Sequence, residues 1–129
     1  MGTTLIPPFQ TERAQRDQAI AALGEANRVR IRRASLMRWL HGQSTAESHE
    51  RAAELMLEPD PALGSMLALG LLERVRQVGP AQAEQMLVCA GVTPTSTVGA
   101  LTPRQRAGLV ALLRLRADQL AHPNRPRAT

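Results

Sequence analysis

Arginine is the residue type in this chain with the clearest potential for chemistry. The 129-residue sequence carries sixteen basic and eleven acidic side chains, and every basic residue is arginine. A guanidinium can pair in a bidentate manner with phosphate or carboxylate oxygens, whereas the absence of lysine is equally typical of a GC-rich coding bias. The densest run is formed by Arg28, Arg30, Arg32 and Arg33, with Arg38 following.

Charge is distributed unevenly along the sequence. Residues 1–40 carry a net charge of +4, residues 41–60 carry −4, and residues 61–129 carry +5. Two basic segments thus flank an acidic one. This pattern favours a polyanionic partner for the basic segments, with the acidic middle solvated or paired internally.

Catalytic and metal-binding patterns are absent from the sequence. It contains no P-loop, no GxGxxG, no HExxH and no CxxC. The histidines, His41, His49 and His122, are too far apart to indicate a paired site, and we expect them at the surface or at helix ends. The single cysteine, Cys89, excludes an intramolecular disulfide and is expected in the core. We therefore predict a protein that is not an enzyme and has no catalytic residues, no metal site and no cofactor.

No stretch of the sequence approaches the length of uncharged apolar residues that a membrane span needs, and no signal peptide pattern occurs at the start. We accordingly expect a cytoplasmic protein without a membrane partner.

The elements that position these arginines should all be helices. Aromatic residues are limited to Phe9 and Trp39, so the core must consist of Leu, Val, Ile, Met and Ala, which favours packed helices. Residues 1–10 are predicted to be a flexible arm, and residues 11–43 to hold a long basic helix from near Thr11 to about His41. Only the second half of this helix has an apolar stripe suited to docking.

The rest of the chain reads as shorter helices, expected to form one domain over residues 44–121. Capping boxes at Ser44 and Thr102 each predict a helix start, and Asp60 with Pro61 predicts a brief helical turn. A buried helix is expected from Met66 to about Val75, and another begins at Pro80 and stops at Gly91. Residues 122–129 are predicted to be a disordered tail.

The segment over residues 67–90 thus predicts a helix, two tight turns and a second helix. The start of that second helix would expose the free backbone amides of Ala81 and Gln82, which suit a phosphate oxygen. Any helix start has this property.

Several short motifs, taken in order, resemble the actinobacterial integration host factors. They are Ala26-Asn27-Arg28-Val29-Arg30, Arg33-Ala34 with Leu36, Leu71-Leu72-Glu73, Val78-Gly79 with Ala83, Thr97-Val98-Gly99, Leu101-Thr102 and Arg104-Gln105-Arg106. The resemblance spans residues 14–116.

The resemblance implies a fold with a long N-terminal helix and a helix-two-turns-helix domain, which binds duplex DNA with little sequence preference and bends or compacts it. In that family the turn before the second helix holds phosphate through backbone amides, helped by neighbouring cations. Here the run from Gly79 to Glu84 has no cation, Pro80 removes one amide donor and Glu84 adds a negative charge. The chain therefore resembles a divergent member, in which we expect binding either to be weaker or to have moved to the first helix and to Arg74, Arg76, Arg104 and Arg106.

We expect a non-enzymatic, nucleoid-associated protein that binds double-stranded DNA largely independently of sequence, as a monomer or weak dimer. The alternatives are a protein-interaction module whose basic helix docks an acidic partner, and an RNA-binding protein. The predicted DNA-binding residues are Arg28, Arg30, Arg32, Arg33, Arg38, Arg74, Arg76, Gly79, Ala81, Gln82, Arg104 and Arg106.

Overall fold

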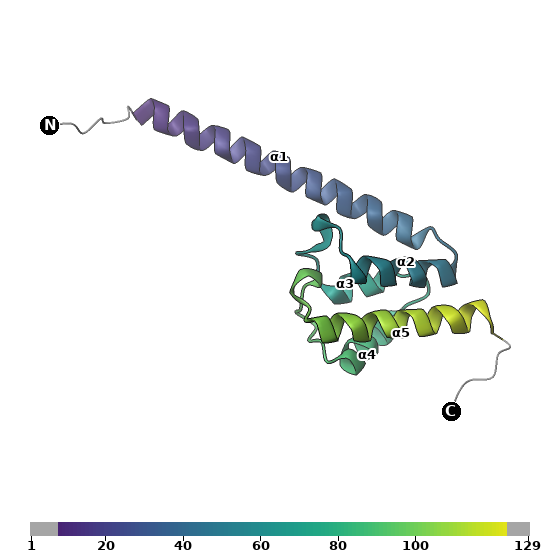
Figure 1. Cartoon of the computed structure of the whole chain (residues 1–129). Helices are drawn as coiled ribbons and strands as arrows, with labels where there is room; N and C mark the ends of the chain where they lie inside the picture. The colour runs from purple at the N-terminus through teal and green to yellow at the C-terminus, as the bar shows by residue number, and fades with distance from the viewer. Residues whose placement is uncertain (1–7, 124–129) are drawn as a thin grey trace.

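The described residues, 8–123 of a computed structural model, form an all-α protein with one very long helix (Figure 1). This confirms the predicted fold class. The elements are α1 (Pro8–His41), α2 (Thr45–Leu57), the 3₁₀ turn η1 (Pro61–Leu63), α3 (Ala68–Glu73), α4 (Pro80–Ala90), the 3₁₀ turn η2 (Val98–Ala100) and α5 (Pro103–Ala121).

Local capping signals set most of the helix starts. The Thr102 hydroxyl accepts from the amide of Gln105, and the Gln105 side chain accepts from the amide of Thr102, which completes the predicted capping box at α5. At α2 only half of the predicted box forms. Ser44 accepts from the amide of Glu47, but the Glu47 carboxylate lies 3.6 Å from Arg51 instead of reaching back.

The core lies mainly between α2 and α5, with α3 and α4 closing one side (Figure 1). It consists of aliphatic side chains and methionine, as the composition predicts. The largest fully buried ones are Leu40, Met56, Leu63, Leu71, Leu72, Leu87, Leu109 and Leu113. Gly91 ends α4 in a left-handed conformation with φ 70°, a backbone geometry that glycine adopts without steric cost.

Only the C-terminal turns of helix α1 lie along the packed helices, and its N-terminal part projects away from them (Figure 1). Leu36, Met37 and Leu40 are buried, whereas residues 11–28 are exposed except for the half-buried Gly24. Docking through the second half was thus predicted correctly, but it is confined to the last turns. The helix also begins at Pro8, before the predicted start near Thr11.

Helix α3 is shorter than predicted because both of its flanks have other partners. Before it, the amide of Ala68 donates to the carbonyl oxygen of Ser96 and the amide of Val98 to that of Met66, which holds Leu67 extended against Thr97. After it, two tight turns follow, and Gln77 adopts a positive φ of 66°. The chain then enters α4, so α3 and α4 form the predicted helix-two-turns-helix unit.

Two expectations about side-chain placement are wrong. Cys89 is exposed on α4 rather than buried, because the opposite side of this helix, with Ala83, Met86 and Leu87, faces the core. His49 is fully buried rather than at the surface. Its Nδ1 contacts the carbonyl oxygen of Thr45 at 2.7 Å, and its Nε2 accepts from Arg116 at 3.2 Å.

Part of the predicted domain division falls outside the described residues, namely residues 1–7 of the arm and 124–129 of the tail. The boundaries 11–43 and 44–121 stay predictions. None of the helices within residues 8–123 is both long and apolar enough to cross a membrane.

Candidate nucleic-acid interface

A basic groove lies between the second half of α1 and the end of α3. Its volume is about 600 Å³. The residues that line it are Arg30, Arg33, Ala34, Met37, Arg38, His41, Gly42, Met66, Glu73 and Arg74. Four of the predicted DNA-binding arginines therefore share one surface, although Arg30 and Arg74 are far apart in sequence. We call this surface the basic groove.

Helical periodicity explains the α1 wall of the basic groove. Its residues recur at intervals of three and four, from Arg30 through Ala34 to Arg38 and His41, so they share one face of the helix. Leu36 and Leu40 point to a neighbouring face and are buried. The burial of these two leucines fixes the rotation of α1, which turns the arginine face toward α3.

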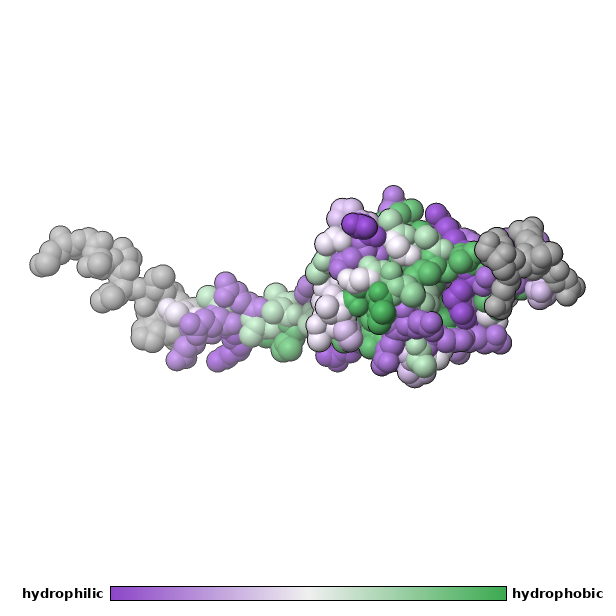
Figure 2. Space-filling view, turned by 90° about the horizontal axis from the view of Figure 1, so that it is seen from below, coloured by the Kyte–Doolittle hydropathy of each residue, from purple (hydrophilic) through white to green (hydrophobic). Residues whose placement is uncertain are grey.

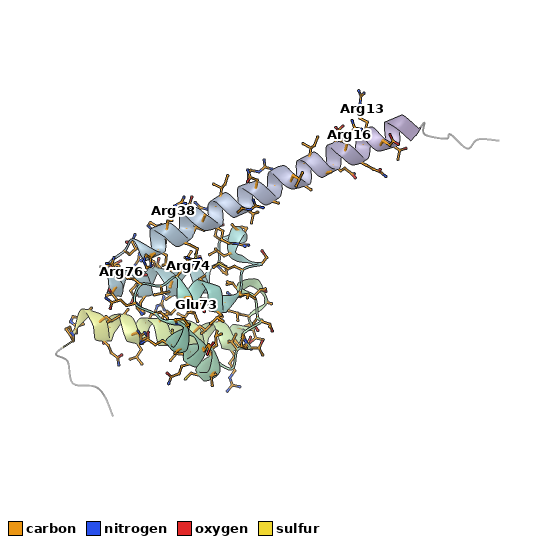
Figure 3. All side chains as sticks on the ribbon, turned by 180° about the vertical axis from the view of Figure 1, so that it is seen from behind. Arg13, Arg16, Arg38, Glu73, Arg74 and Arg76 are labelled. Carbon is orange, nitrogen blue, oxygen red and sulfur yellow. The ribbon has the colours of Figure 1, made fainter. Side chains whose placement is uncertain are left out.

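Most of the guanidinium groups in the basic groove are available to a ligand. Arg30 and Arg74 are exposed and have no hydrogen-bond or ion-pair partner among the described residues. Arg38 makes only a long contact of 3.5 Å with the Ser35 hydroxyl. Glu73 is the single carboxylate in the lining. Figure 3 shows Arg38 on α1 near Arg74 and Arg76, which follow α3.

Arg33 lines the basic groove and also ties α1 to the segment before α3. Its Nε donates to the carbonyl oxygen of Ala62 at 3.1 Å, and its Nη2 donates to the Ser65 hydroxyl at 2.7 Å. These bonds tie α1 to η1 and the segment after it. Arg33 therefore has a structural role in addition to any contact with a ligand.

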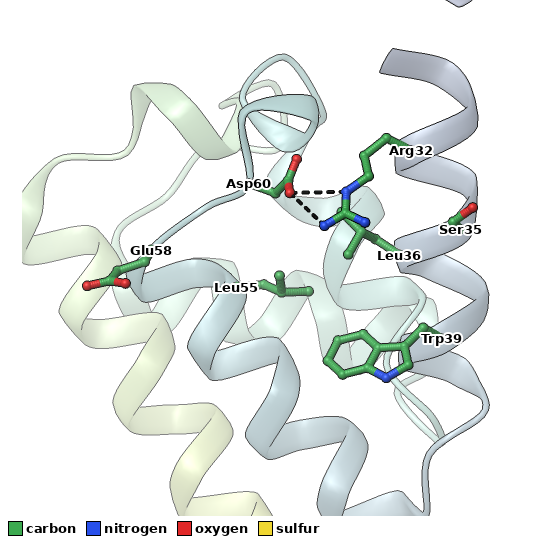
Figure 4. Close-up of a pocket in the computed structure, with 7 residues that line it drawn as sticks. All are labelled: Arg32, Ser35, Leu36, Trp39, Leu55, Glu58 and Asp60. Carbon is green, nitrogen blue, oxygen red and sulfur yellow. Dashed lines mark hydrogen bonds and ion pairs between the residues drawn. The ribbon is translucent and has the colours of Figure 1, made fainter. Parts of the chain in front are cut away.

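Arg32 lies on the other side of α1 and is ion-paired. Both its Nε and Nη2 donate to Asp60 Oδ2, at 3.2 and 3.0 Å (Figure 4). Asp60 also accepts from the amide of Ala62 through Oδ1 at 3.0 Å. That backbone hydrogen bond, followed by the pairing with Arg32, holds the pKa of the Asp60 carboxyl below its ordinary value.

The Arg32–Asp60 pair rims a second hollow, of about 560 Å³, between α1 and α2 (Figure 4). Leu36, Leu55 and the partly exposed Trp39 form its apolar lining, and Glu58 completes it. Its carboxylates make this hollow a poor match for a polyanion.

Arg28 is also paired, although less firmly. Its Nη2 lies 2.7 Å from Glu25 Oε2, and both side chains are largely exposed, so this pair contributes little stability. Asp60 neutralises Arg32 across 28 residues of sequence, a pairing that the local spacing of charges on α1 does not predict. Arg28 and Arg32 are therefore weaker candidates than Arg30.

Arg106 points into the protein rather than toward solvent. Its Nη1 donates to the carbonyl oxygen of Met56 at 2.6 Å, and its Nη2 donates to that of Val98 at 2.9 Å. A guanidinium held in this way joins the end of α2 to η2 and is not free for a phosphate. We correct the predicted site by removing Arg106.

The two remaining predicted arginines lie outside the lining of the basic groove. Arg76 is exposed and donates through Nη1 to the carbonyl oxygen of Gln43 at 3.2 Å, while its amide donates to the buried Ser48 hydroxyl. Ser48 in turn donates to the carbonyl oxygen of Leu40, so it links α1, α2 and the turn after α3. Arg104 is exposed in the first turn of α5, without a partner among the described residues.

The turn before α4 keeps two free backbone donors. The amides of Ala81 and Gln82 have no acceptor among the described residues, whereas the amide of Gly79 donates to the Gln82 side chain at 3.2 Å. Pro80 and Glu84 are both exposed at this end of the helix. The geometry that the sequence predicts at Ala81 and Gln82 is therefore present, while Gly79 has an internal partner.

Two ionisable residues of the basic groove, His41 and Glu73, are not among the predicted site residues. His41 falls on the same helix face as Arg30 and Arg38, three residues after Arg38, so periodicity alone was sufficient to include it. Glu73 precedes Arg74 in sequence and enters the lining because α3 ends against α1.

Comparison with known proteins gives one informative match. No protein-family model matches the chain, and neither does any curated protein. A solved structure of sIHF, an integration host factor, bound to an 8-base-pair palindromic DNA is similar, with 26% sequence identity and a TM-score of 0.54. The alignment covers 70% of this chain and 98% of that chain. The chain thus has a fold like that of a DNA-bound integration host factor.

Proposed function

We propose that this chain is a non-enzymatic DNA-binding protein that contacts the phosphates of double-stranded DNA and acts on duplex architecture. The observation that carries the proposal is the basic groove, where Arg30, Arg38 and Arg74 converge from two helices without ion-pair partners in the described chain. The similarity to sIHF bound to DNA supports the same function. A role at the nucleoid follows from this proposal.

The chemistry of the basic groove suits a phosphate backbone rather than base edges. Guanidinium groups neutralise phosphates and release condensed counterions, which gives affinity without reading sequence. Arg30 and Arg38 line the groove from α1 and Arg74 from the end of α3, which supports contact with the phosphates of one duplex from two elements. Any preference among duplexes should therefore follow their shape and deformability.

The turn before α4 is the second proposed contact. The amides of Ala81 and Gln82 can donate to one phosphate oxygen at the positive end of the α4 dipole. Because Glu84 opposes an anion there and no cation assists, we assign this turn a smaller share of the affinity than the basic groove.

The test is fluorescence anisotropy on a duplex with the variant Arg30→Ala/Arg38→Ala/Arg74→Ala. We expect affinity at low salt to fall at least about 30-fold, because three phosphate contacts are lost. The control is Arg114→Ala, which removes one exposed charge from α5, outside the groove lining. It should change the affinity less than about twofold.

Both variants must melt cooperatively near the wild type, which the exposure of the replaced side chains leads us to expect. If the triple variant binds duplex DNA as tightly as the control does, the basic groove is not the DNA site. If it keeps duplex binding but loses an acidic protein or RNA ligand, the corresponding alternative function takes its place.

A further inference from the structure

One exposed stripe runs along the whole of α1 and ends in the basic groove. Its members recur at intervals of three and four residues and lie within an arc of about 100° around the helix axis. All of them are exposed: Arg13, Arg16, Ile20, Leu23, Asn27, Arg30, Ala34, Arg38 and His41. The last four line the basic groove. The α1 wall of the groove therefore continues without a break to the projecting end of the helix.

The far end of the stripe carries a second pair of free cations. Arg13 and Arg16 have no partner among the described residues, and Figure 3 places them at the opposite end of α1 from Arg38. Glu12 and Asp17 flank them at the edges of the stripe and are not ion-paired with them. These carboxylates reduce the local positive charge but leave both guanidinium groups accessible.

Aliphatic side chains occupy the stripe between its two basic ends. Ile20 is 61% exposed and Leu23 is 70% exposed. Figure 2 shows this as a hydrophobic section of the projecting rod, between its hydrophilic end and the packed helices. A helix segment that contacts no other part of its own chain gains little from such residues in water, whereas the sugar edges of a DNA groove can cover them.

The length of the stripe matches one turn of duplex. Arg13 and Arg38 are 25 residues apart, which corresponds to about 38 Å along an α-helix, and one turn of B-DNA measures about 34–36 Å. An 8-base-pair duplex, as in the sIHF complex, is only about 27 Å long, so a duplex seated at Arg38 and Arg74 ends short of both Arg16 and Arg13.

From this match we infer that the projecting half of α1 is a second DNA-contacting segment, in which Arg13 and Arg16 bind phosphates about one turn away from the basic groove. The inference rests on the proposed function, since the same duplex must occupy the groove. It implies that the natural ligand is a duplex longer than about one turn and that α1 lies along this duplex.

Two duplexes separate this inference from the proposed function itself. The variant Arg13→Ala/Arg16→Ala is titrated with a duplex of 8 base pairs and with one of about 20 base pairs. We expect its affinity for the long duplex to fall at least about fivefold and its affinity for the short duplex to stay within about twofold of the wild type. The charge-neutralising control, Glu12→Gln/Asp17→Asn, should strengthen binding of the long duplex only.

Equal effects of Arg13→Ala/Arg16→Ala on both duplexes, or no effect on either, would overturn the inference. Absence of wild-type binding to both duplexes would instead refute the proposed function.

Sedimentation of the variant Ile20→Ser/Leu23→Ser tests whether a second copy of the chain covers the stripe instead of DNA. Three results together would show that a second copy covers the stripe and that the inference is wrong. The wild type would be a dimer, the variant would be a monomer, and the variant's affinity for the long duplex would be unchanged. We expect a monomer in both cases and weaker binding of the long duplex by the variant.

Discussion

A guanidinium is available to a phosphate only when the protein has not already satisfied its hydrogen bonds. Arg30 and Arg106 look alike in sequence, yet Arg30 has no partner in the described chain and Arg106 donates to carbonyl oxygens 50 and 8 residues away. Spacing cannot predict bonds across such separations, because the packing of α2 against α5 creates them. The sequence therefore reveals which arginines are present but not which of them the fold leaves without hydrogen-bond partners.

Arg106→Ala should destabilise the fold without weakening DNA binding directly. The substitution leaves the carbonyl oxygens of Met56 and Val98 without their donor, and charge-assisted hydrogen bonds of this kind contribute about 1.5–3 kcal/mol each. We expect the free energy of unfolding to fall by about 3 kcal/mol or more in urea titrations. Unchanged stability with lower duplex affinity would return Arg106 to the binding site, as the sequence predicts.

His49 should make the stability of the protein depend on pH. Burial, with a smaller contribution from the Arg116 cation, lowers the pKa of this imidazole below 6.5, although the bond to Thr45 opposes the shift. The unfolded chain therefore binds more protons than the folded one between the folded pKa and 6.5. Stability should fall as pH decreases below about 6.5, with a slope of at most about 1.4 kcal/mol per pH unit from this group.

The variant His49→Gln checks this dependence by thermal or urea unfolding between pH 5 and 7. It should show a flatter pH profile than the wild type in this window. Asp60, whose lowered pKa stabilises the fold above about 3.8, loses its effect only in more acidic solution, so the two groups can be separated. A wild-type pH profile as flat as that of the variant would contradict the assignment of this pH dependence to His49.

At the scale of elements, local signals predicted helix starts well and helix lengths less well. The caps at Ser44, Asp60 and Thr102 act within three residues, so the sequence reveals them directly. Helix α3 is cut short by hydrogen bonds with residues 96–98, a partner about 30 residues away that helix propensity does not report. The apolar pattern of α4 likewise does not distinguish the side of the helix that faces the core from the side that exposes Cys89.

The attachment of α1 to η1 provides the test at this scale. Asp60→Asn keeps a side-chain acceptor for the Ala62 amide but removes the ion pair that occupies Arg32. The substitution removes one negative charge beside α1 and frees a guanidinium on the side of α1 away from the basic groove, so we expect duplex affinity at low salt to rise by no more than about two- to threefold and the salt slope to steepen by at most about 0.9. The free energy of unfolding should fall by no more than about 1 kcal/mol, because Arg32 is well exposed.

Affinity and salt slope are measured together on one duplex for the wild type and Asp60→Asn. An affinity that drops, with α1 loosened according to hydrogen exchange, would mean that the ion pair positions α1 for binding and does not merely occupy Arg32.

At the scale of the whole molecule, folding brings together the two basic segments that an acidic segment separates in the sequence. The acidic middle segment is partly paired internally, through Arg51 with Glu47 and Glu54 and through Arg32 with Asp60. The two flanking basic segments meet in the basic groove. Charge counting predicted a polyanion partner, but the groove itself depends on the contact between α1 and the end of α3, which the pattern of either segment alone does not contain.

The dependence of duplex affinity on salt tests the central claim most directly. Wild-type protein is titrated with two unrelated duplexes of about 20 base pairs at several salt concentrations. Arg30, Arg38 and Arg74 with a partial contribution from the turn before α4 predict a slope of log affinity against log salt of about −3 or steeper, with nearly equal affinities for the two sequences. A slope near zero, or strong binding to one sequence only, would contradict phosphate binding by the basic groove.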